Sequence, residues 1–277
     1  MKVLITGGAG FIGSHVADAY VNAGHEVIIV DNLSTGSTKN IPKKAKFYLL
    51  DIGAQELDKV FELEKPEIVD HHAAQISVTV STRDPIQDAK INALGLLNLL
   101  ETSVRHSIKK FIFISTGGAI YGDTEIMPTP EDHPSQPISP YGIHKYLGEQ
   151  YLRFYAEQHG LKYTVLRYSN VYGPRQNPLG EAGVVSIFIN SLLGERLLRY
   201  FPTPKSRTGC CGTTYMWKTL PGQIFKPRTR GSGSSSISVQ ALPPRPGRCT
   251  EKSAPCSRTR PSLSGQMPDP GIFAAAV

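Results

Sequence analysis

Glycines that follow the first apolar run of the chain limit what its N-terminal part can fold into. The run at 2–6 leads directly into Thr6-Gly7-Gly8-Ala9-Gly10-Phe11-Ile12-Gly13, where a helical segment begins. Glycines at these spacings let a strand turn tightly into a helix and let the backbone approach a pyrophosphate, which the free N–H groups of the helix N-terminus favour. The pattern therefore predicts a strand, a phosphate-binding turn and a helix in succession.

An acidic residue ends the second apolar run, at 26–30. Asp31 follows Gly13 by 18 residues, close to the spacing of ~20 that is typical of an acid that binds an adenosine ribose. A carboxylate at this place accepts a hydrogen bond from the ribose 2′-hydroxyl and repels a 2′-phosphate. The sequence therefore predicts that the bound dinucleotide is NAD rather than NADP.

Apolar runs rich in Val and Ile alternate with segments of helical period through the first 200 residues. This alternation predicts an α/β fold, a Rossmann-like doubly wound parallel sheet. The expected strands cover 2–6, 26–30, 46–50, 67–71, 110–115 and 162–167, and the expected helices cover 11–23, 54–64, 85–104, 140–159 and 183–194. Asp84-Pro85 and Ser139-Pro140 are typical starts for two of these helices.

The charge of the chain is unevenly distributed. Residues 1–200 contain 19 Lys and Arg against 21 Asp and Glu, whereas residues 201–277 contain 11 against 2. The C-terminal part also has all four cysteines, the only tryptophan and 11 of the 21 prolines. We therefore expect a folded domain at 1–200 and a basic, poorly ordered Pro/Ser/Arg-rich tail at 201–277.

Several classes of protein are excluded by what the sequence lacks. Its apolar runs are all shorter than the ~18 residues of a membrane span, and no cleavage signature follows the first one, so we expect neither a membrane protein nor a secreted one. The cysteines, at 210, 211, 249 and 256, have no metal-ligand spacing, and no metal site is predicted. The basic tail can contact phosphates nonspecifically, but no specific nucleic-acid site is predicted.

Small or polar residues follow two further strands of the expected sheet. Asp51-Ile52 ends one of them, and His71-His72 leads into Ala73-Ala74-Gln75 after the next. Because the carboxyl ends of parallel strands border one crevice, we expect these residues to line it. The two adjacent histidines are equally compatible with one core and one surface position.

A tyrosine and a lysine four residues apart follow the fifth strand. That strand ends in Ser115-Thr116, and Tyr141-Gly142-Ile143-His144-Lys145 begins 25 residues after Thr116, inside an expected helix. Residues four apart share a helix face, so we expect the Lys145 ammonium to favour the Tyr141 phenolate. A free tyrosine has a pKa near ~10, too high for a base at neutral pH. The motif alone is common on solvated helices, but with the glycine turn and Thr116 it indicates acid–base chemistry.

Together these motifs resemble the extended short-chain dehydrogenase/reductase family, the NAD-dependent epimerases and dehydratases, and within it the UDP-glucose 4-epimerases. The resemblance covers about residues 1–200. Its matching residues are the glycine turn at 7–13, Asp31, Asn32, Asp51, Ile52, Ala73, Ala74, Gln75, Asn92, Thr116, Tyr141, Lys145 and the run 167–175.

The resemblance implies an isomerase that inverts C4 of UDP-glucose or UDP-galactose through a 4-keto sugar. Tyr141 would take the proton of the 4-hydroxyl while hydride passes from C4 to NAD, and Thr116 would bind the same oxygen. Lys145 would bind the nicotinamide ribose, and the protein would be a cytoplasmic homodimer that packs through the helices at 85–104 and 140–159. The implied NAD contacts are Gly7, Gly10, Phe11, Ile12, Gly13, Asp31, Asn32, Asp51, Ile52, Ala73, Ala74, Gln75, Asn92, Ser115, Tyr141, Lys145 and Tyr168, and the implied substrate contacts are Thr116, Tyr141 and Asn170.

The residues after Thr116 separate epimerases from related enzymes. Dehydratases that resemble this chain carry Asp-Glu there, whereas this chain has Gly117 and Gly118. The segment 115–122 also lacks the acidic or arginine-rich residues expected of nucleotide-sugar decarboxylases. Epimerisation is therefore favoured, with a dehydratase or decarboxylase as the alternative. Two residues depart from the family pattern: Ser169 replaces an aromatic residue, and His144 is unusual inside the Tyr/Lys motif.

The small substrate domain that the resemblance implies is degraded or missing after residue 195. Its motifs Arg-Asp-Tyr-Val-Tyr-Val-Asp-Asp and Phe-Asn-Ile-Gly-Thr-Gly are absent. In a shifted reading frame, each new codon joins the third base of one codon to the first two bases of the next. In this frame, allowed codons of residues 211–227 can encode a sequence that begins Arg-Asp-Tyr-Val-His-Val-Glu-Asp. The codons of residues 235–241 can encode Phe-Asn-Ile-Ser-Ala-Gly in the same frame. Two expected motifs in one register indicate a shifted reading frame. The alternatives are a disordered basic tail and a catalytically impaired NAD-binding remnant.

Overall fold

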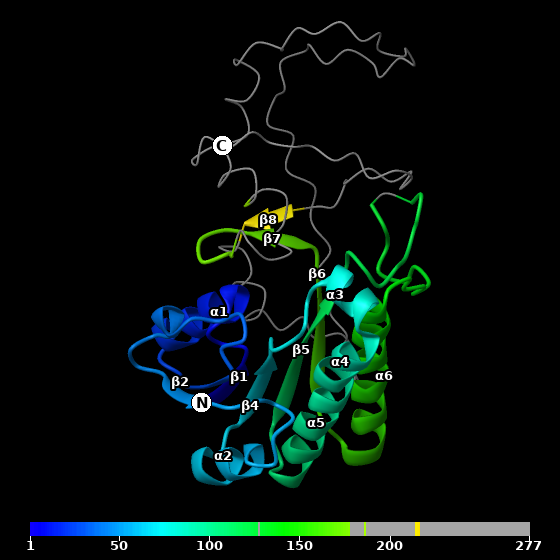
Figure 1. Ribbon diagram of the computed structural model, residues 1–277. Helices are drawn as coiled ribbons and strands as arrows, with labels where there is room; N and C mark the ends of the chain where they lie inside the picture. Colours follow the sequence, from blue (N-terminus) through cyan, green and yellow to red (C-terminus); the bar gives the residue numbers. More distant parts are fainter. Residues whose placement is uncertain (127, 178–185, 187–213, 217–277) are drawn as a thin grey trace, which may run out of the picture. The chain divides into compact units, whose positions relative to one another are not determined.

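The computed structural model of the protein describes residues 1–126, 128–177, 186 and 214–216 (Figure 1). Four predictions therefore concern residues that the structure does not describe, wholly or in large part. These are the helix at 183–194, the order of the tail at 201–277, the shifted-frame motifs at 211–227 and 235–241, and the surroundings of the four cysteines.

A six-stranded parallel sheet forms the centre of the described part, as predicted. Its strands lie in the order β3-β2-β1-β4-β5-β6, so the two halves of the chain extend outward from the β1–β4 pair. Ligands of such sheets bind where the strand order reverses. The strands are β1 (Lys2–Thr6), β2 (Glu26–Asp31), β3 (Lys46–Leu49), β4 (Ile68–His71), β5 (Lys110–Thr116) and β6 (Tyr163–Tyr168).

The helices begin and end close to their expected positions, with one exception. The helix expected at 85–104 is one continuous run whose middle turn, η2, is a π-helix. The short helix α3 was not predicted. The helical elements are α1 (Phe11–Asn22), η1 (Thr38–Asn40), α2 (Leu57–Glu64), α3 (Val78–Arg83), α4 (Pro85–Ala89), η2 (Lys90–Leu94), α5 (Gly95–Arg105) and α6 (Pro140–His159).

Side chains cap the two helices that were predicted to begin with a capping residue and a proline. Asp84 Oδ1 accepts a hydrogen bond from Gln87 N at 2.9 Å, at the start of α4. Ser139 Oγ accepts one from Gly142 N at 3.2 Å, at the start of α6. These bonds satisfy N–H groups that have no partner within the helix.

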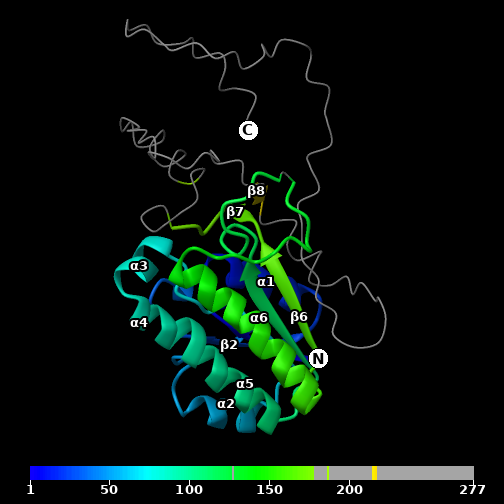
Figure 2. The same cartoon turned by 90° about the vertical axis from the view of Figure 1, so that its right-hand side faces the viewer.

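Helices cover both faces of the sheet (Figure 2). On one face α1 packs against apolar residues of β1 and β2, and on the other face α2, α5 and α6 cover a larger core. Strands buried on both faces are continuously apolar, which explains why the runs in the sequence located them. No helix in the described part of the chain is long and apolar enough to cross a membrane.

Two further short strands follow the main sheet in sequence. β7 (Asn170–Tyr172) pairs in parallel with β8 (Thr214–Met216), and Asn170 is the register partner of Thr214. β8 therefore lies within the segment where the sequence predicts a shifted reading frame. This pairing was not predicted.

A polar contact joins the ends of the two central strands. Thr6 Oγ1 of β1 lies 2.7 Å from His71 Nδ1 of β4, and it also accepts a hydrogen bond from Ala73 N at 3.2 Å. The His71 ring is buried and stacks on Phe113, with the ring centroids 5.8 Å apart. Burial lowers the pKa of His71 well below its ordinary value, and the nearby Lys145 and His72 lower it further. His71 is therefore a neutral residue of the core.

We expect His71 to make the protein less stable in acid. Because its pKa is lower in the folded than in the unfolded state, the unfolded chain binds more protons below about pH 6.5. The free energy of unfolding then falls with pH by up to about 1.4 kcal/mol per pH unit for this residue. Urea unfolding measures the free energy of unfolding at each pH between about pH 7 and pH 5. In His71→Gln this free energy should change less steeply with pH, by the equivalent of about one proton. Thr6→Val loses the same contact but keeps the imidazole, so it should be less stable with the pH dependence of the unmodified protein. Equal pH dependence in all three proteins would contradict the role of His71 in acid sensitivity.

Candidate active site

The glycine turn packs closely on its surroundings and leaves the start of α1 open. A Cβ on Gly13 would lie 2.2 Å from Gly7 O, and one on Gly7 would lie 2.6 Å from Ala73 N. Gly7 also has a φ of +68°, which disfavours other residues. No side chain caps the first turn of α1, which begins after Gly10. Open N–H groups next to a glycine-rich turn fit a pyrophosphate.

Asp31 closes the same turn from the end of β2. Its Oδ2 accepts a hydrogen bond from Ala9 N at 2.9 Å, and its Oδ1 accepts one from Leu33 N at 2.8 Å. Each carboxylate oxygen can accept a second bond, so Asp31 retains acceptor capacity for a ribose hydroxyl. The residues present therefore fit NAD.

Residues after β2 and β3 meet beside Asp31. Asn32 Nδ2 donates to Asp51 Oδ2 at 2.8 Å, and Asp51 Oδ1 accepts from Gly53 N at 2.8 Å. Ile52 is buried, and its carbonyl accepts from Asn98 Nδ2 of α5 at 2.7 Å. The structure thus brings together Asn32, Asp51 and Ile52, which the sequence placed at one edge.

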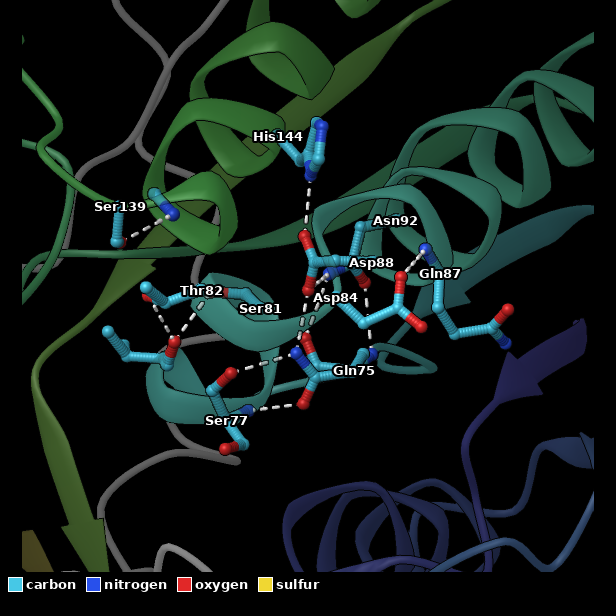
Figure 3. A network of polar contacts seen from close by, with 12 residues as sticks. Gln75, Ser77, Ser81, Thr82, Asp84, Gln87, Asp88, Asn92, Ser139 and His144 are labelled. Atoms are coloured by element: carbon cyan, nitrogen blue, oxygen red, sulfur yellow. Dashed lines mark hydrogen bonds and ion pairs between the residues drawn. The ribbon is translucent and has the colours of Figure 1, made fainter.

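The segment after β4 is fixed by η2. Gln75 N donates to Asn92 Oδ1 at 3.0 Å, and Asn92 Nδ2 donates back to Gln75 O at 2.8 Å (Figure 3). Gln75 is held a second time by Ser77, whose N donates to Gln75 Oε1 at 2.6 Å. π-Helical turns often occur at functional sites, and this one presents Asn92 to the strand end.

The side chains of the two adjacent histidines are both buried, rather than one in the core and one on the surface. The His72 side chain is 3% exposed, and its Nε2 lies 3.0 Å from Asp70 Oδ1. His71 points to the opposite face of the sheet, toward Phe113. Successive side chains of a strand alternate between faces, so each histidine has its own buried environment.

Tyr141, Lys145 and Thr116 gather where β5 ends and α6 begins. Lys145 is buried, and its Nζ donates to Ile114 O at 2.8 Å. This Nζ lies 5.0 Å from the ring centroid of Phe113 and 6.0 Å from that of Tyr141. Tyr141 and Thr116 share a hydrogen bond. The lysine thus lies on the same side of α6 as the tyrosine, as the spacing predicts.

The pKa values correct one expectation. Burial raises the pKa of Tyr141 to about 12, although the hydrogen bond with Thr116 lowers it, and the charge of Asp88 raises it further. Burial also lowers the pKa of Lys145 to about 8, against the opposing effect of Asp88. Burial therefore keeps the pKa of the Tyr141 phenol above neutrality, and the group that lowers this pKa in the structure is Thr116 rather than Lys145.

Three predicted site residues have their side chains engaged elsewhere or exposed. Ser115 Oγ donates to Glu149 Oε1 of α6 at 2.6 Å, so its hydroxyl points into the protein. The Tyr168 ring packs in the apolar cluster that Ile12 borders, and burial raises the pKa of its phenol well above the ordinary value. Asn170, the first residue of β7, is exposed.

Asp88 is the site residue that the sequence analysis missed. It is buried on α4 and bonds with His144, Gln75 and Asn92. The signal that was available is its position four residues before Asn92, which places both on one helix face. Within the described residues no group of three or more His, Cys, Asp or Glu side chains is arranged to hold a metal ion.

Comparisons with known proteins agree with these motifs. The sequence profile of the NAD dependent epimerase/dehydratase family matches residues 3–207. A putative UDP-glucose 4-epimerase of Methanocaldococcus jannaschii is 49% identical over 191 residues, which cover 69% of this chain and 63% of that protein. The chain thus spans less than two thirds of the length of that relative.

Solved structures give the same result. The UDP-glucose 4-epimerase of Thermotoga maritima, solved with UDP-glucose, has a TM-score of 0.76 and 50% identity, covering 80% of this chain and 71% of that chain. The UDP-glucose 4-epimerase of Thermus thermophilus, solved with NAD, has a TM-score of 0.76 and 43% identity, and the match covers 81% of this chain and 73% of that chain. The predicted fold, NAD as cofactor and an isomerase relationship are confirmed at the level of the family. The chain belongs to the NAD dependent epimerase/dehydratase family.

Proposed function

We propose that this chain derives from an NAD-dependent epimerase that inverts C4 of a UDP-hexose, interconverting UDP-glucose and UDP-galactose. The observation that carries the proposal is the meeting of two motifs at one sheet edge. The glycine turn and Asp31 close the end of β1, and Thr116, Tyr141 and Lys145 gather at the end of β5. Relatives named UDP-glucose 4-epimerase support the choice of substrate.

The roles of the residues follow from their contacts. Bound NAD would accept hydride from C4 and return it, and its oxidised ring would add positive charge. Tyr141 holds a proton at Oη in its buried setting, and a positive charge beside it would lower its pKa so that it can accept the sugar 4-hydroxyl proton. Thr116 orients Oη through their shared bond. Lys145, which is anchored on Ile114 O, would donate to the nicotinamide ribose of bound NAD.

Epimerisation is favoured over elimination by the residues after Thr116. Gly117 N donates to Tyr168 O at 2.7 Å, and Gly118 N donates to Thr116 Oγ1 at 3.2 Å. Neither residue carries an acid that would protonate a leaving hydroxyl, which a dehydratase requires. C4 inversion needs no such acid.

We also propose that residues 1–200 are the catalytic domain and that the uridine-binding part is encoded in a shifted frame. The family profile ends at residue 207, shortly before residue 211, where the shifted reading yields an expected motif. A catalytically impaired, NAD-binding remnant is the second candidate for the chain as it stands. Its cytoplasmic location and lack of a specific nucleic-acid site stay predictions.

Turnover should therefore depend on the reading frame. A protein in which the shifted reading replaces the residues from 211 onward should convert UDP-galactose to UDP-glucose, and the present chain should bind NAD with little or no turnover.

Tyr141→Phe in the repaired protein should lose at least ~100-fold in kcat, because its proton acceptor is gone. A coupled assay for UDP-glucose and calorimetric titration with NAD and NADP measure these quantities. Preference for NADP, or full turnover by the present chain, would contradict the proposal.

A homodimer is the second part of the proposal. Large apolar side chains are exposed along α4, η2 and α6, namely Ile86, Leu94, Ile143 and Phe154. Ile86 is 70% exposed and Leu94 is 60% exposed. These residues lie on the helices through which the resemblance implies a dimer, and an interface there would cover them.

Sedimentation velocity tests this surface. At micromolar concentration we expect a dimer for the present chain and a monomer for Ile143→Asp, because a buried, unpaired carboxylate opposes association. Ile138→Asp is the control, since Ile138 is 74% exposed and lies outside these helices. A dimer in Ile143→Asp, or a monomer in the unmodified chain, would overturn this interface.

A further inference from the structure

Asp88 on α4 is a buried carboxylate that the proposed reaction does not use. His144 Nδ1 donates to its Oδ2 over 2.5 Å (Figure 3). Its Oδ1 accepts from Gln75 Nε2 at 2.6 Å and from Asn92 Nδ2 at 3.0 Å. The amide nitrogens of Gln75 and Asn92 are donors, so the network satisfies an ionised carboxylate. Because an ionised carboxylate oxygen only accepts, the network assigns a proton to Nδ1 of His144.

The three donors come from three parts of the candidate active site. His144 lies on α6, inside the Tyr/Lys motif, Asn92 lies in η2, and Gln75 follows β4. Gln75 and Asn92 also bond each other, as described above. Asp88 therefore links the helix that carries the proposed acid–base residues to the proposed cofactor edge by hydrogen bonds.

Burying a charge is costly unless hydrogen bonds and a partner compensate, and removing one partner of a buried pair costs several kcal/mol. The Asp88 side chain has no exposed surface, and that of His144 is 15% exposed. An apolar pair would fill such a space at lower cost. A retained charge at this place points to a role in fixing geometry and in the electrostatics of its neighbours.

Lys145 is the neighbour on which this charge acts favourably. Among the described charged groups, Asp88 is the one that raises the pKa of Lys145 against burial. Other titratable groups on the elements around Lys145 are His71 of β4, which is neutral, and Tyr141, His144 and Glu149 of α6. Glu149 forms an ion pair with Arg167 of β6. From β5, Lys145 contacts the Phe113 ring and the Ile114 carbonyl.

We propose that Asp88 and His144 are positioning residues for α6: their contact holds this helix against Gln75 and η2 and keeps one fixed negative charge beside Lys145. The inference rests on the proposed function, because it assumes that Lys145 binds NAD. It explains why a histidine occupies this unusual position in the Tyr/Lys motif, since its Nδ1 reaches a carboxylate on another helix.

The test is NAD affinity measured by calorimetry between about pH 6 and pH 10, in the full chain. The affinity of the unmodified chain should decline as Lys145 loses its proton, with a midpoint at about pH 8. In Asp88→Asn the midpoint should move down by about one pH unit, because the charge that favours the cation is gone. In His144→Ala the affinity should fall about tenfold at every pH, with the midpoint unchanged. In His144→Asn the amide N–H replaces Nδ1–H, so this variant should recover most of the lost affinity.

Asp84→Asn is the matched control. It removes a negative charge from the exposed start of the same helix, and Asn caps a helix as well as Asp, so it should keep the unmodified midpoint. An unchanged midpoint in a folded Asp88→Asn would overturn the electrostatic role. If thermal unfolding shows that this variant does not fold, equal affinities of His144→Ala and His144→Asn would overturn the pair. Loss of NAD binding by the unmodified chain would overturn the proposed function instead.

Discussion

The close packing of the turn after β1 is the constraint on which the rest of the structure depends. Gly7 and Gly13 meet backbone atoms where any side chain would stand: Gly7 lies against the backbone of His72 and Ala73 after β4, and Gly13 of α1 lies against Gly7 O. Asp31 then reaches Ala9 N from the next strand, and Thr6 reaches His71 from below the turn. This glycine-rich turn therefore packs directly on the segment after β4, and the Asp31 and Thr6 contacts tie it to the ends of β2 and β4.

The sequence was sufficient to predict those helices and strands whose residue pattern has a single physical cause. The six strands are apolar because helices cover both faces of the sheet, and α4 and α6 have capping residues at their first turn. Helix α3 was missed because Val78-Thr79-Val80 favours a strand by propensity. Its start depends on Ser77, whose hydroxyl accepts from Val80 N. β8 was missed because its pairing with β7 depends on contacts distant in sequence.

The sequence predicted which strand ends form the site, but it predicted the contacts of the side chains there only in part. The spacing of Tyr141 and Lys145 gave their shared face, and the strand ends gave Gln75 and Asp51. Spacing gave no sign that Ser115 turns toward Glu149 or that the Tyr168 ring packs beneath α1, since both depend on which face of a strand the register exposes. Asp88 has no motif of its own, and only its three partners reveal its importance.

Opposing effects set the protonation of the site. Burial favours the neutral form of both Tyr141 and Lys145, and the charge of Asp88 favours the protonated form of both. The described residues therefore keep the phenol protonated, and Lys145 holds its charge largely through Asp88. On the proposed function, the shift toward phenolate requires a further positive charge, which an oxidised nicotinamide carries and a reduced one lacks. Tyr141 would then become a base only beside an oxidised cofactor, so removal of the proton would be coupled to the presence of a hydride acceptor.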